Sequence, residues 1–341
     1  MESVITNRIY CDWGTTSLRI RIIKDKDFEQ VHEIATSNGI STVYKEWSKV
    51  EEGKSEQDRI DFYLSFLQPY ISTIVEKVVN DGTSLELVIS GMGSSSIGVI
   101  ELPYAELPFS IHGENVIARR ISPTAAFNYD VLLVSGVKGD NEVMRGEETQ
   151  LIGILASNPP FEDKKETIFI FPGTHAKHIY VNGNFATKIE TYITGELFSI
   201  LCNNGLLKEA VQQVKNIVNE DDWIVFDEGI DCSGTIGLLQ SLFRIRTNHL
   251  LKKFTKQQNY IFLSGLLIGY ELRNLTTKEF SRLVLCSEQN LFDYYKRAMI
   301  HLGLHNVTTF VNPETVKNAT IRGQAKIADY YLQKVENHEH K

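Results

Sequence analysis

Two similar segments, about half a chain apart, place the strongest limit on how this sequence can fold. Residues 9–23 read IYCDWGTTSLRIRII: a short apolar run, a corner of small residues and an alternating apolar run. Residues 167–181 read TIFIFPGTHAKHIYV and follow the same plan. Period-two alternation around a glycine predicts a strand, a tight turn and a returning strand in each segment. The chain is therefore expected to consist of two halves that each open with a hairpin.

The corner of the first hairpin has the chemistry of a phosphate-binding turn. Gly14 allows a sharp turn and leaves room for a ligand, and Thr15, Thr16 and Ser17 offer backbone N–H groups and hydroxyls to phosphate oxygens. Asp12, at the end of the first strand, is well placed to hold a hydrated Mg²⁺ ion, which prefers one or two carboxylates plus water and phosphate oxygens. An ordinary hairpin in which Asp12 caps the turn is the alternative interpretation.

Composition argues against several other classes of protein. The chain has 341 residues, 42% hydrophobic and 23% charged, which is ordinary for a globular protein and suggests two domains. Its net charge of −8 argues against nonspecific binding to nucleic acid. The cysteines show no CxxC spacing and the first residues no export pattern, so we expect reduced thiols and a cytoplasmic location. The longest apolar run, residues 260–270, is too short to span a membrane.

Apolar periodicity predicts an alternation of strands and helices in both halves. In the first half we expect strands over 28–34, 85–89 and 131–135, and helices over 58–79 and 142–155, the second capped by Asp140 or Asn141. In the second half we expect strands over 185–192, 283–287 and 307–311, and helices over 195–202, 208–218, 233–243, 264–272, 291–303 and 322–335. Asn158-Pro159-Pro160 predicts the boundary between an N-terminal lobe, 1–158, and a C-terminal lobe, 159–341, whose closing helix can pack back on the first lobe.

The two hairpins resemble the ATP-binding turns of the actin, hexokinase and Hsp70 superfamily. This resemblance implies an α/β fold of two ribonuclease-H-like lobes, with mixed sheets flanked by helices and an ATP and sugar cleft between the lobes. Gly173, Thr174 and His175 would then contact the second side of the triphosphate. Lys177 would add a positive charge, unless it is simply a solvated lysine of the hairpin. Pro172 stands where many superfamily members have an Asp, so the metal would depend on Asp12 alone.

A more specific resemblance is carried by six blocks in a fixed order. They are CDWGTTSLR, SGMGSS near Gly91, VMRGEETQLIG over 143–153, PGTHAKH near Gly173, TYITGELF over 191–198, and SGLLIGYEL from Ser264. Together these blocks resemble the 2-keto-3-deoxygalactonate kinases, over about residues 9–326. The resemblance implies ATP-dependent phosphorylation of 2-dehydro-3-deoxy-D-galactonate at its 6-hydroxyl, in galactonate breakdown, and Mg²⁺ is the metal expected at Asp12.

The resemblance also suggests which residues bind the sugar acid. Related sugar kinases place a proton-accepting Asp just after a strand and at the start of a helix, and Asp140 fits that position; a simple helix cap is the alternative. Glu147 and Glu148 are the next candidates, or they hold sugar hydroxyls or form a salt bridge with Arg145. Arg145 is the nearest partner for the substrate carboxylate, although it could equally be structural.

Two glycine-containing segments complete the predicted site. Gly91 and Met92 follow a buried strand, at the edge of a sheet where ligands of α/β proteins bind, unless the segment is a plain flexible connection. Gly265 and Gly269 lie one helical turn apart and would leave a smooth face for adenine, unless they serve tight packing.

The sequence leaves three functions open. They are a 2-keto-3-deoxygalactonate kinase, a kinase of the same fold that acts on another sugar or sugar acid, and a non-catalytic ATP-binding scaffold. The epimer of the substrate stays open. In each enzyme interpretation the partner is a small sugar acid, with no nucleic acid and no membrane, and a homodimer is the default assembly.

Overall fold

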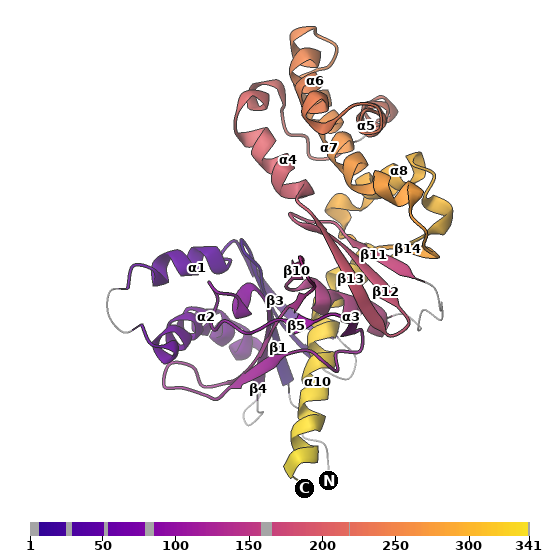
Figure 1. The fold of residues 1–341 in the computed structure, drawn as a ribbon. Helices are drawn as coiled ribbons and strands as arrows, with labels where there is room; N and C mark the ends of the chain where they lie inside the picture. Colours follow the sequence, from indigo (N-terminus) through magenta and orange to yellow (C-terminus); the bar gives the residue numbers. More distant parts are fainter. Residues whose placement is uncertain are drawn as a thin grey trace. The chain divides into compact units, whose positions relative to one another are not determined.

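The computed structural model describes residues 7–24, 29–50, 54–78, 85–157, 166–217 and 219–339, and the chain divides into two units (Figure 1). The first unit contains residues 1–162, 184–188 and 317–341. The second contains residues 163–183 and 189–316. The closing helix is therefore part of the first unit, and the predicted boundary at Asn158 lies outside the described residues.

The main sheet of the first unit has three antiparallel strands, then two parallel ones and an antiparallel strand at the far edge. Its order is β3-β2-β1-β4-β8-β7, with β1 parallel to β4 and β4 parallel to β8. The strands are β1 (Asn7–Trp13), β2 (Leu18–Lys24), β3 (Glu29–Thr36), β4 (Leu85–Gly91), β7 (Ala118–Ile121) and β8 (Asp130–Val134). Short strands β5 (Ala105–Glu106), β9 (Val137–Lys138) and β10 (Val143–Met144) form a small second sheet.

Alternation along β1 assigns its two faces to different helices. Ile9, Cys11 and Trp13 are buried in a core with α1 (Ile40–Trp47) and α2 (Glu56–Val78). The opposite face carries Asp12 and faces α10 (Ala319–Glu339), because Gln324 of that helix contacts β1. Helix α3 (Glu147–Ser157) packs along α10.

The second unit repeats this strand order. Its sheet runs β13-β12-β11-β14-β15, again with three antiparallel strands followed by two parallel ones. The strands are β11 (Thr167–Phe171), β12 (Ala176–Asn182), β13 (Phe185–Tyr192), β14 (Arg282–Leu285) and β15 (Thr308–Phe310). Phe185 and Ala186, in the part of β13 assigned to the first unit, pair with β6 (Phe109–Ser110).

Helices enclose the apolar core of the second unit. They are α4 (Thr194–Asn203), α5 (Glu220–Cys232), α6 (Leu238–Leu250), α7 (Lys256–Arg273) and α8 (Gln289–His301). The short helix α9 (Pro313–Lys317) follows β15. Helix α5 packs closely on α7, as Figure 1 shows in orange and red tones. The predicted α/β class with two mixed sheets flanked by helices is confirmed.

Two predicted helices are wrong in part. The segment 142–155 begins as strand β10, and its helix starts only at Glu147, because Gly146 has a φ of +114°, which a helix does not allow. Residues 208–217 of the predicted helix 208–218 do not form an α-helix: a 3₁₀ turn covers Leu206–Ala210, and the Gln212 N–H bonds to the Lys256 carbonyl instead.

Helix α5 was not predicted at its true position. Asn219 caps it by accepting a hydrogen bond from the Asp222 N–H at 2.8 Å, and α5 ends at Cys232, where the sequence suggested that a helix begins.

In the described parts of the chain, no helix is long and apolar enough to cross a membrane.

Candidate functional site

The first predicted turn is tightly formed and open to solvent. The Gly14 N–H donates to the Ser17 carbonyl at 2.9 Å, and Thr15, Thr16 and Ser17 are exposed. The turn is supported by the start of α1, because the Ile40 N–H donates to the Gly14 carbonyl at 3.0 Å. The hydroxyls that the sequence assigned to phosphate are therefore available to a ligand.

Gly39 explains how α1 can approach this turn so closely. A Cβ atom at Gly39 would lie 2.4 Å from the Thr15 carbonyl oxygen and 2.5 Å from the Ser17 nitrogen. Only glycine fits between the helix and the turn without a shift of the backbone. This residue was missed in the sequence, although the glycine directly before a helix was a usable signal.

Asp12 and Gly91 lie together at the carboxyl ends of two parallel strands. Trp13 pairs with Gly91 in the register of β1 and β4. A Cβ atom on Gly91, whose φ is +83°, would lie 2.8 Å from the Trp13 carbonyl oxygen and 3.5 Å from Oδ1 of Asp12. A Cβ atom on Gly146 would lie 3.6 Å from the Gly91 Cα. The start of α3 therefore reaches the same strand ends, where ligands of α/β proteins bind.

The segment after Gly91 is held in place rather than loosely connected. Met92–Ser94 forms a 3₁₀ turn, and Ser94, which is buried, donates its hydroxyl to the Val134 carbonyl at 2.7 Å. Arg145 donates to the Ser94 carbonyl at 2.6 Å, and its guanidinium lies 4.1 Å from the ring centre of Tyr104. Arg145 thus has a structural role in this segment, while its buried Nε has no partner among the described residues.

The two glutamates at the start of α3 differ in exposure. Glu147 is half-buried and accepts from the Arg145 N–H at 3.1 Å. Glu148 is buried, and its carboxylate accepts from the Gly146 N–H at 2.8 and 3.0 Å and from the Thr149 hydroxyl at 2.9 Å. Burial, together with the charge of Glu147, raises the pKa of Glu148 from its ordinary value of 4.5 to about 7.

Asp140 does not lie at the start of a helix, so the predicted helix cap is wrong, while its role as the proton acceptor stays a prediction. It is exposed in the turn between β9 and β10, where the Gly139 N–H donates to the Glu142 carbonyl at 2.8 Å. The helix begins seven residues later in the chain, at Glu147. The residues at the start of this helix are therefore the two glutamates Glu147 and Glu148.

The second predicted turn is supported in the same manner as the first. A Cβ atom on Gly195 would lie 2.5 Å from the Gly173 carbonyl oxygen, so α4 approaches the turn closely. The Glu196 N–H donates to the Thr174 carbonyl at 2.9 Å. The side chain of Glu196 also pairs with Nε2 of His175, and both side chains are about half exposed.

Lys177 and its neighbours form a buried polar layer behind this turn. Lys177 is buried and donates from Nζ to the Thr191 hydroxyl at 2.9 Å, so it is not a solvated hairpin lysine. Nearby, buried Glu271 accepts from the Tyr295 hydroxyl at 2.7 Å and from the Thr194 hydroxyl, and contacts Nε2 of His178 at 3.2 Å.

A cavity of about 400 Å³ opens beside the second turn. Gly173, Thr194 and Gly195 lie at one side, and α7 and α8 provide the others. The remaining lining residues include Phe198, Tyr260, Ser264, Leu267, Ile268, Asn290, Tyr294 and Tyr295. Aromatic and aliphatic walls with a few polar groups, in this range of volume, are typical of small-molecule sites.

The predicted smooth face at Gly265 and Gly269 is filled by protein. A Cβ atom on Gly265 would lie 2.0 Å from the Phe226 carbonyl oxygen, and one on Gly269 would lie 3.0 Å from the Ile230 Cα. Both neighbours belong to α5, so the side that lacks a Cβ serves helix packing and is not open to a flat ring. Helix α7 instead contributes Ser264 and Ile268 to the cavity.

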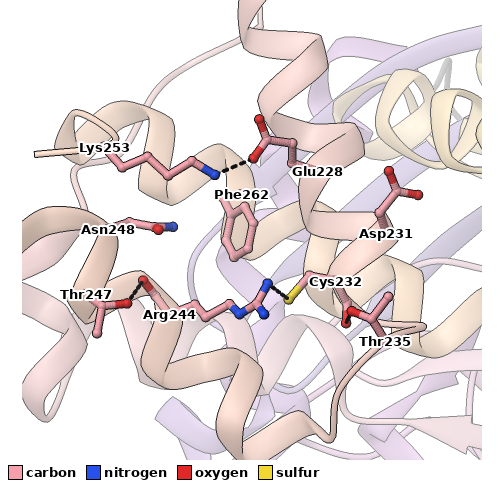
Figure 2. Close-up of a pocket in the computed structure, with 9 residues that line it drawn as sticks. All are labelled: Glu228, Asp231, Cys232, Thr235, Arg244, Thr247, Asn248, Lys253 and Phe262. Carbon is pink, nitrogen blue, oxygen red and sulfur yellow. Dashed lines mark hydrogen bonds and ion pairs between the residues drawn. The ribbon is translucent and has the colours of Figure 1, made fainter. Parts of the chain in front are cut away.

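Another cavity of the second unit, of about 410 Å³, is lined mainly by polar side chains (Figure 2). Lys253 pairs with Glu228 at 2.7 Å across it, and Nη1 of Arg244 lies 3.6 Å from the Cys232 sulfur. None of the residues predicted from the sequence is among those that line it.

The residues around Asp12 limit the kind of metal that they could hold. Within the described ranges, no three His, Cys, Asp or Glu side chains are close enough to form a metal site by themselves. Asp12 shares a small cavity with Arg19, Arg21 and Lys317. A single carboxylate fits Mg²⁺, which keeps several waters and binds phosphate oxygens, better than a metal that needs a full set of protein ligands.

The structure brings the predicted residues together as two groups, one in each unit. Asp12, Gly91, Arg145 and Glu147 belong to the first group, and the turn at Gly173 to the second. The expectation that both turns bind one triphosphate concerns the placement of the two units, and it stays a prediction.

A known protein family matches this sequence over nearly its whole length. The family model for 2-keto-3-deoxy-galactonokinase matches residues 12–327. A 2-dehydro-3-deoxygalactonokinase of Escherichia coli K12 is 29% identical over 248 residues, which cover 70% of this chain and 78% of the relative. A Rhizobium meliloti protein provisionally given the same name is 26% identical over 267 residues, 76% of this chain and 78% of the relative.

The fold has a solved counterpart. A Sinorhizobium meliloti protein, provisionally described as a 2-dehydro-3-deoxygalactonokinase, aligns with a TM-score of 0.75 at 23% identity, over 94% of this chain and 95% of its own. Because the family model spans nearly the whole sequence, from Asp12 at the first turn to Ile327 in α10, the chain belongs to the 2-keto-3-deoxy-galactonokinase family of sugar-acid kinases.

Proposed function

We propose that the protein phosphorylates 2-dehydro-3-deoxy-D-galactonate at its 6-hydroxyl with ATP, in the breakdown of galactonate. The observation that carries this proposal is the grouping of Asp12, Gly91 and the start of α3 at one sheet edge, since these elements contain three of the family-like sequence blocks. A homodimer and a cytoplasmic location, both expected from the sequence, stay predictions.

In this proposal the first turn holds the metal and part of the triphosphate. Asp12 holds Mg²⁺ through water, and Gly14, Thr15, Thr16 and Ser17 offer N–H and hydroxyl groups to phosphate oxygens. Bound Mg²⁺ supplies neutralisation of the charge on the transferring phosphoryl group. The exposure of the three hydroxyls and the single carboxylate at the strand end support this assignment.

The second unit is proposed to bind the adenosine. The cavity of about 400 Å³ adjoins Gly173, and its walls of Tyr260, Ile268 and Tyr294 suit a flat aromatic base. Gly173, Thr174 and His175 then lie where phosphates leave the cavity, with Lys177 as a buried positive charge behind them. Gly265 and Gly269 contribute by letting α7 pack on α5, not by contact with the base.

The sugar acid is proposed to bind at the edge of the first sheet. Gly91 and Met92 provide close backbone approach, and the unpartnered Nε of Arg145 suits a carboxylate. Glu147, the more accessible of the two α3 glutamates, is the proposed proton acceptor for the 6-hydroxyl. Glu148 shapes the helix start by accepting from Gly146.

The proton acceptor can be tested by two matched substitutions. Glu147→Gln should lower kcat by about 10²–10⁴-fold, the range typical of general-base loss, whereas Asp140→Asn should change it by less than about threefold. A large loss in Asp140→Asn with an active Glu147→Gln variant would return the role to Asp140.

A coupled assay of ADP release across a panel of sugar acids tests the whole proposal. Stimulation by 2-dehydro-3-deoxygalactonate with phosphate at the 6-position, identified by phosphorus NMR, is the expected result. Equal or greater stimulation by its gluconate-derived epimer or by another sugar would reassign the substrate. ATP binding with no stimulated turnover would indicate a scaffold instead of an enzyme.

The nucleotide pocket has a test of its own. Ser264→Phe fills the cavity beside Gly173 and should raise the KM for ATP by at least about tenfold, because a bulky ring removes the space for the base. Thr247→Phe is the matched control, since it fills the other cavity of similar volume. An unchanged KM in Ser264→Phe, in a folded protein, would place the base elsewhere.

A further inference from the structure

We infer that Gln324 of α10 is a positioning residue that fixes Asp12 and Gly91 relative to each other. This inference rests on the proposed function, in which Asp12 holds the metal and Gly91 contacts the substrate. Gln324 lies more than 300 residues from Asp12 in the sequence and is fully buried.

The hydrogen bonds of Gln324 join the two strand ends that carry these residues. Its Nε2 donates to the Cys11 carbonyl at 2.8 Å and to the Ser90 hydroxyl at 2.9 Å, with the Val88 carbonyl at 3.5 Å. Cys11 and Ser90 directly precede Asp12 and Gly91. One side-chain amide therefore bridges β1 and β4 at the last residue before each site residue.

The carbonyl end of the Gln324 amide belongs to a residue that lines the same small cavity as Asp12. Oε1 of Gln324 and Nη2 of Arg21 have no hydrogen-bond partner among the described residues, and both residues are buried. Both line the same cavity of about 10 Å³ as Asp12. This volume is near the lower limit for one water molecule, which needs at least two polar partners. A water there could donate to Gln324 and accept from Arg21, next to the carboxylate of Asp12.

The packing of α10 keeps Gln324 at a fixed height along the strands. A Cβ atom on Gly323 would lie 1.9 Å from the Thr149 carbonyl oxygen, and one on Gly153 would lie 1.8 Å from the Ala319 carbonyl oxygen. The two helices therefore meet at close backbone contacts that only glycine allows at these positions. Because α3 begins at Glu147, a single helix sets the relative positions of the metal ligand, the substrate segment and the proposed proton acceptor.

Gln324→Leu tests the inference, because leucine keeps much of the volume and removes all the bridging hydrogen bonds. The Mg²⁺ concentration for half-maximal activity should rise by about 10–100-fold, as is typical when a partner that orients a metal ligand is lost. Amide hydrogen exchange should become faster in residues 10–14 and 88–92, and this readout needs neither metal nor substrate. Ser90→Ala, which removes one of the bonds, should give a smaller change in the same direction.

Ile327→Ala is the matched control. Ile327 is buried one turn further along α10, and its loss should lower Tm without touching the strand ends. Its Mg²⁺ requirement and its exchange in residues 10–14 should equal those of the wild type. If Gln324→Leu lowers Tm but leaves both measurements within twofold of the wild type, or if Ile327→Ala changes them equally, Gln324 is only structural.

The same experiment separates the inference from the proposed function. If the wild-type protein shows no Mg²⁺-dependent phosphorylation of a sugar acid, the proposed function fails. The exchange measurement on Gln324→Leu then still decides whether Gln324 holds the two strand ends together. If the wild type is active and exchange in Gln324→Leu is unchanged, only the inference fails.

Discussion

The turns at Gly14 and Gly173 are supported in the same way, but the residues that precede them differ in charge. Each follows the first strand of its sheet, and each is held by a glycine at the start of the next helix, Gly39 before α1 and Gly195 in α4. Two residues before the turn glycine, however, the first unit has the carboxylate of Asp12 and the second has the buried ring of Phe171.

The residues opposite Asp12 and Phe171, on the returning strands, are alike in charge. Arg19 pairs with Asp12 across β1 and β2, and Lys177 pairs with Phe171 across β11 and β12. Both returning strands thus carry a cation, but only the first strand of the first unit adds an acid. This difference predicts that the hairpin of the first unit serves a metal and that of the second an anion alone.

The largest expected effect tests whether the metal belongs to the first turn. Asp12→Asn should lower kcat on the order of 10³-fold, because loss of charge stabilisation by a bound metal is worth several kcal/mol. The measurement is steady-state kinetics with Mg²⁺ varied, and chelation of Mg²⁺ should reduce the wild type to a similar level.

Asp130→Asn provides the control for Asp12→Asn. Asp130 is an exposed carboxylate at the start of β8 in the same sheet, at the opposite end of the strand from the proposed ligand-binding edge. Its substitution should leave kcat within about twofold. Near wild-type turnover in Asp12→Asn would remove the metal from the first turn and with it the contrast between the two units.

The second effect is electrostatic and belongs to the first unit alone. Because burial raises the pKa of Glu148 to about 7, the folded protein keeps a proton that the unfolded chain loses near pH 4.5. This contribution to stability is fully present below pH 4.5 and is lost as the pH rises to about 7. A shift of this size corresponds to about 3 kcal/mol.

Chemical denaturation of the wild type and of Glu148→Gln between pH 4.5 and 8 measures this effect. The difference in unfolding free energy between the two proteins should shift in favour of the variant as the pH rises, and then stay constant above about pH 7. Glu147→Gln, at the half-exposed neighbouring position, should show little of this shift. A parallel pH profile for wild type and Glu148→Gln would contradict the buried, protonated state.

The sequence predicted the parts of the fold that depend on local patterns. The two hairpins and strand β13 follow period-two alternation, and α2 shows apolar residues at helical spacing, so each was found close to its true bounds. Helix α3 was misplaced because the φ of Gly146, which stops the helix, is a backbone property that no apolar pattern reports.

The site was predictable only where residues close in sequence act together. Asp12 and the Gly14 turn form one segment, and so do Arg145 and Glu147. Gln324 has no local signal, because its role depends on α10 returning to the first unit and packing on β1 and β4. Gly265 shows the opposite case: its spacing was visible in the sequence, but whether it faced a ligand or α5 depended on tertiary packing.

The shared support of the two turns gives the third prediction. Gly39→Ala and Gly195→Ala should each destabilise the protein by about 1–3 kcal/mol, because each new methyl group would lie about 2.5 Å or less from a backbone oxygen. Gly237→Ala is the control, since its Cβ meets nothing within 4 Å. Thermal denaturation of the three variants measures the effect, and a neutral result for only one of the two turns would break their equivalence.

The smallest effect concerns an ion pair that ties the second turn to its supporting helix by side chains. His175 pairs with Glu196 in the second unit, but both are about half exposed, so the pair should contribute no more than about 1 kcal/mol. His175→Gln should therefore change Tm little. If His175 instead contacts phosphate, the KM for ATP should rise severalfold while Tm stays constant.

Glu196→Gln separates the two roles, because it breaks the same pair without removing a group proposed to contact phosphate. If both variants raise the KM for ATP equally, His175 acts only through its pair with Glu196. The second turn would then bind phosphate through its backbone and Lys177.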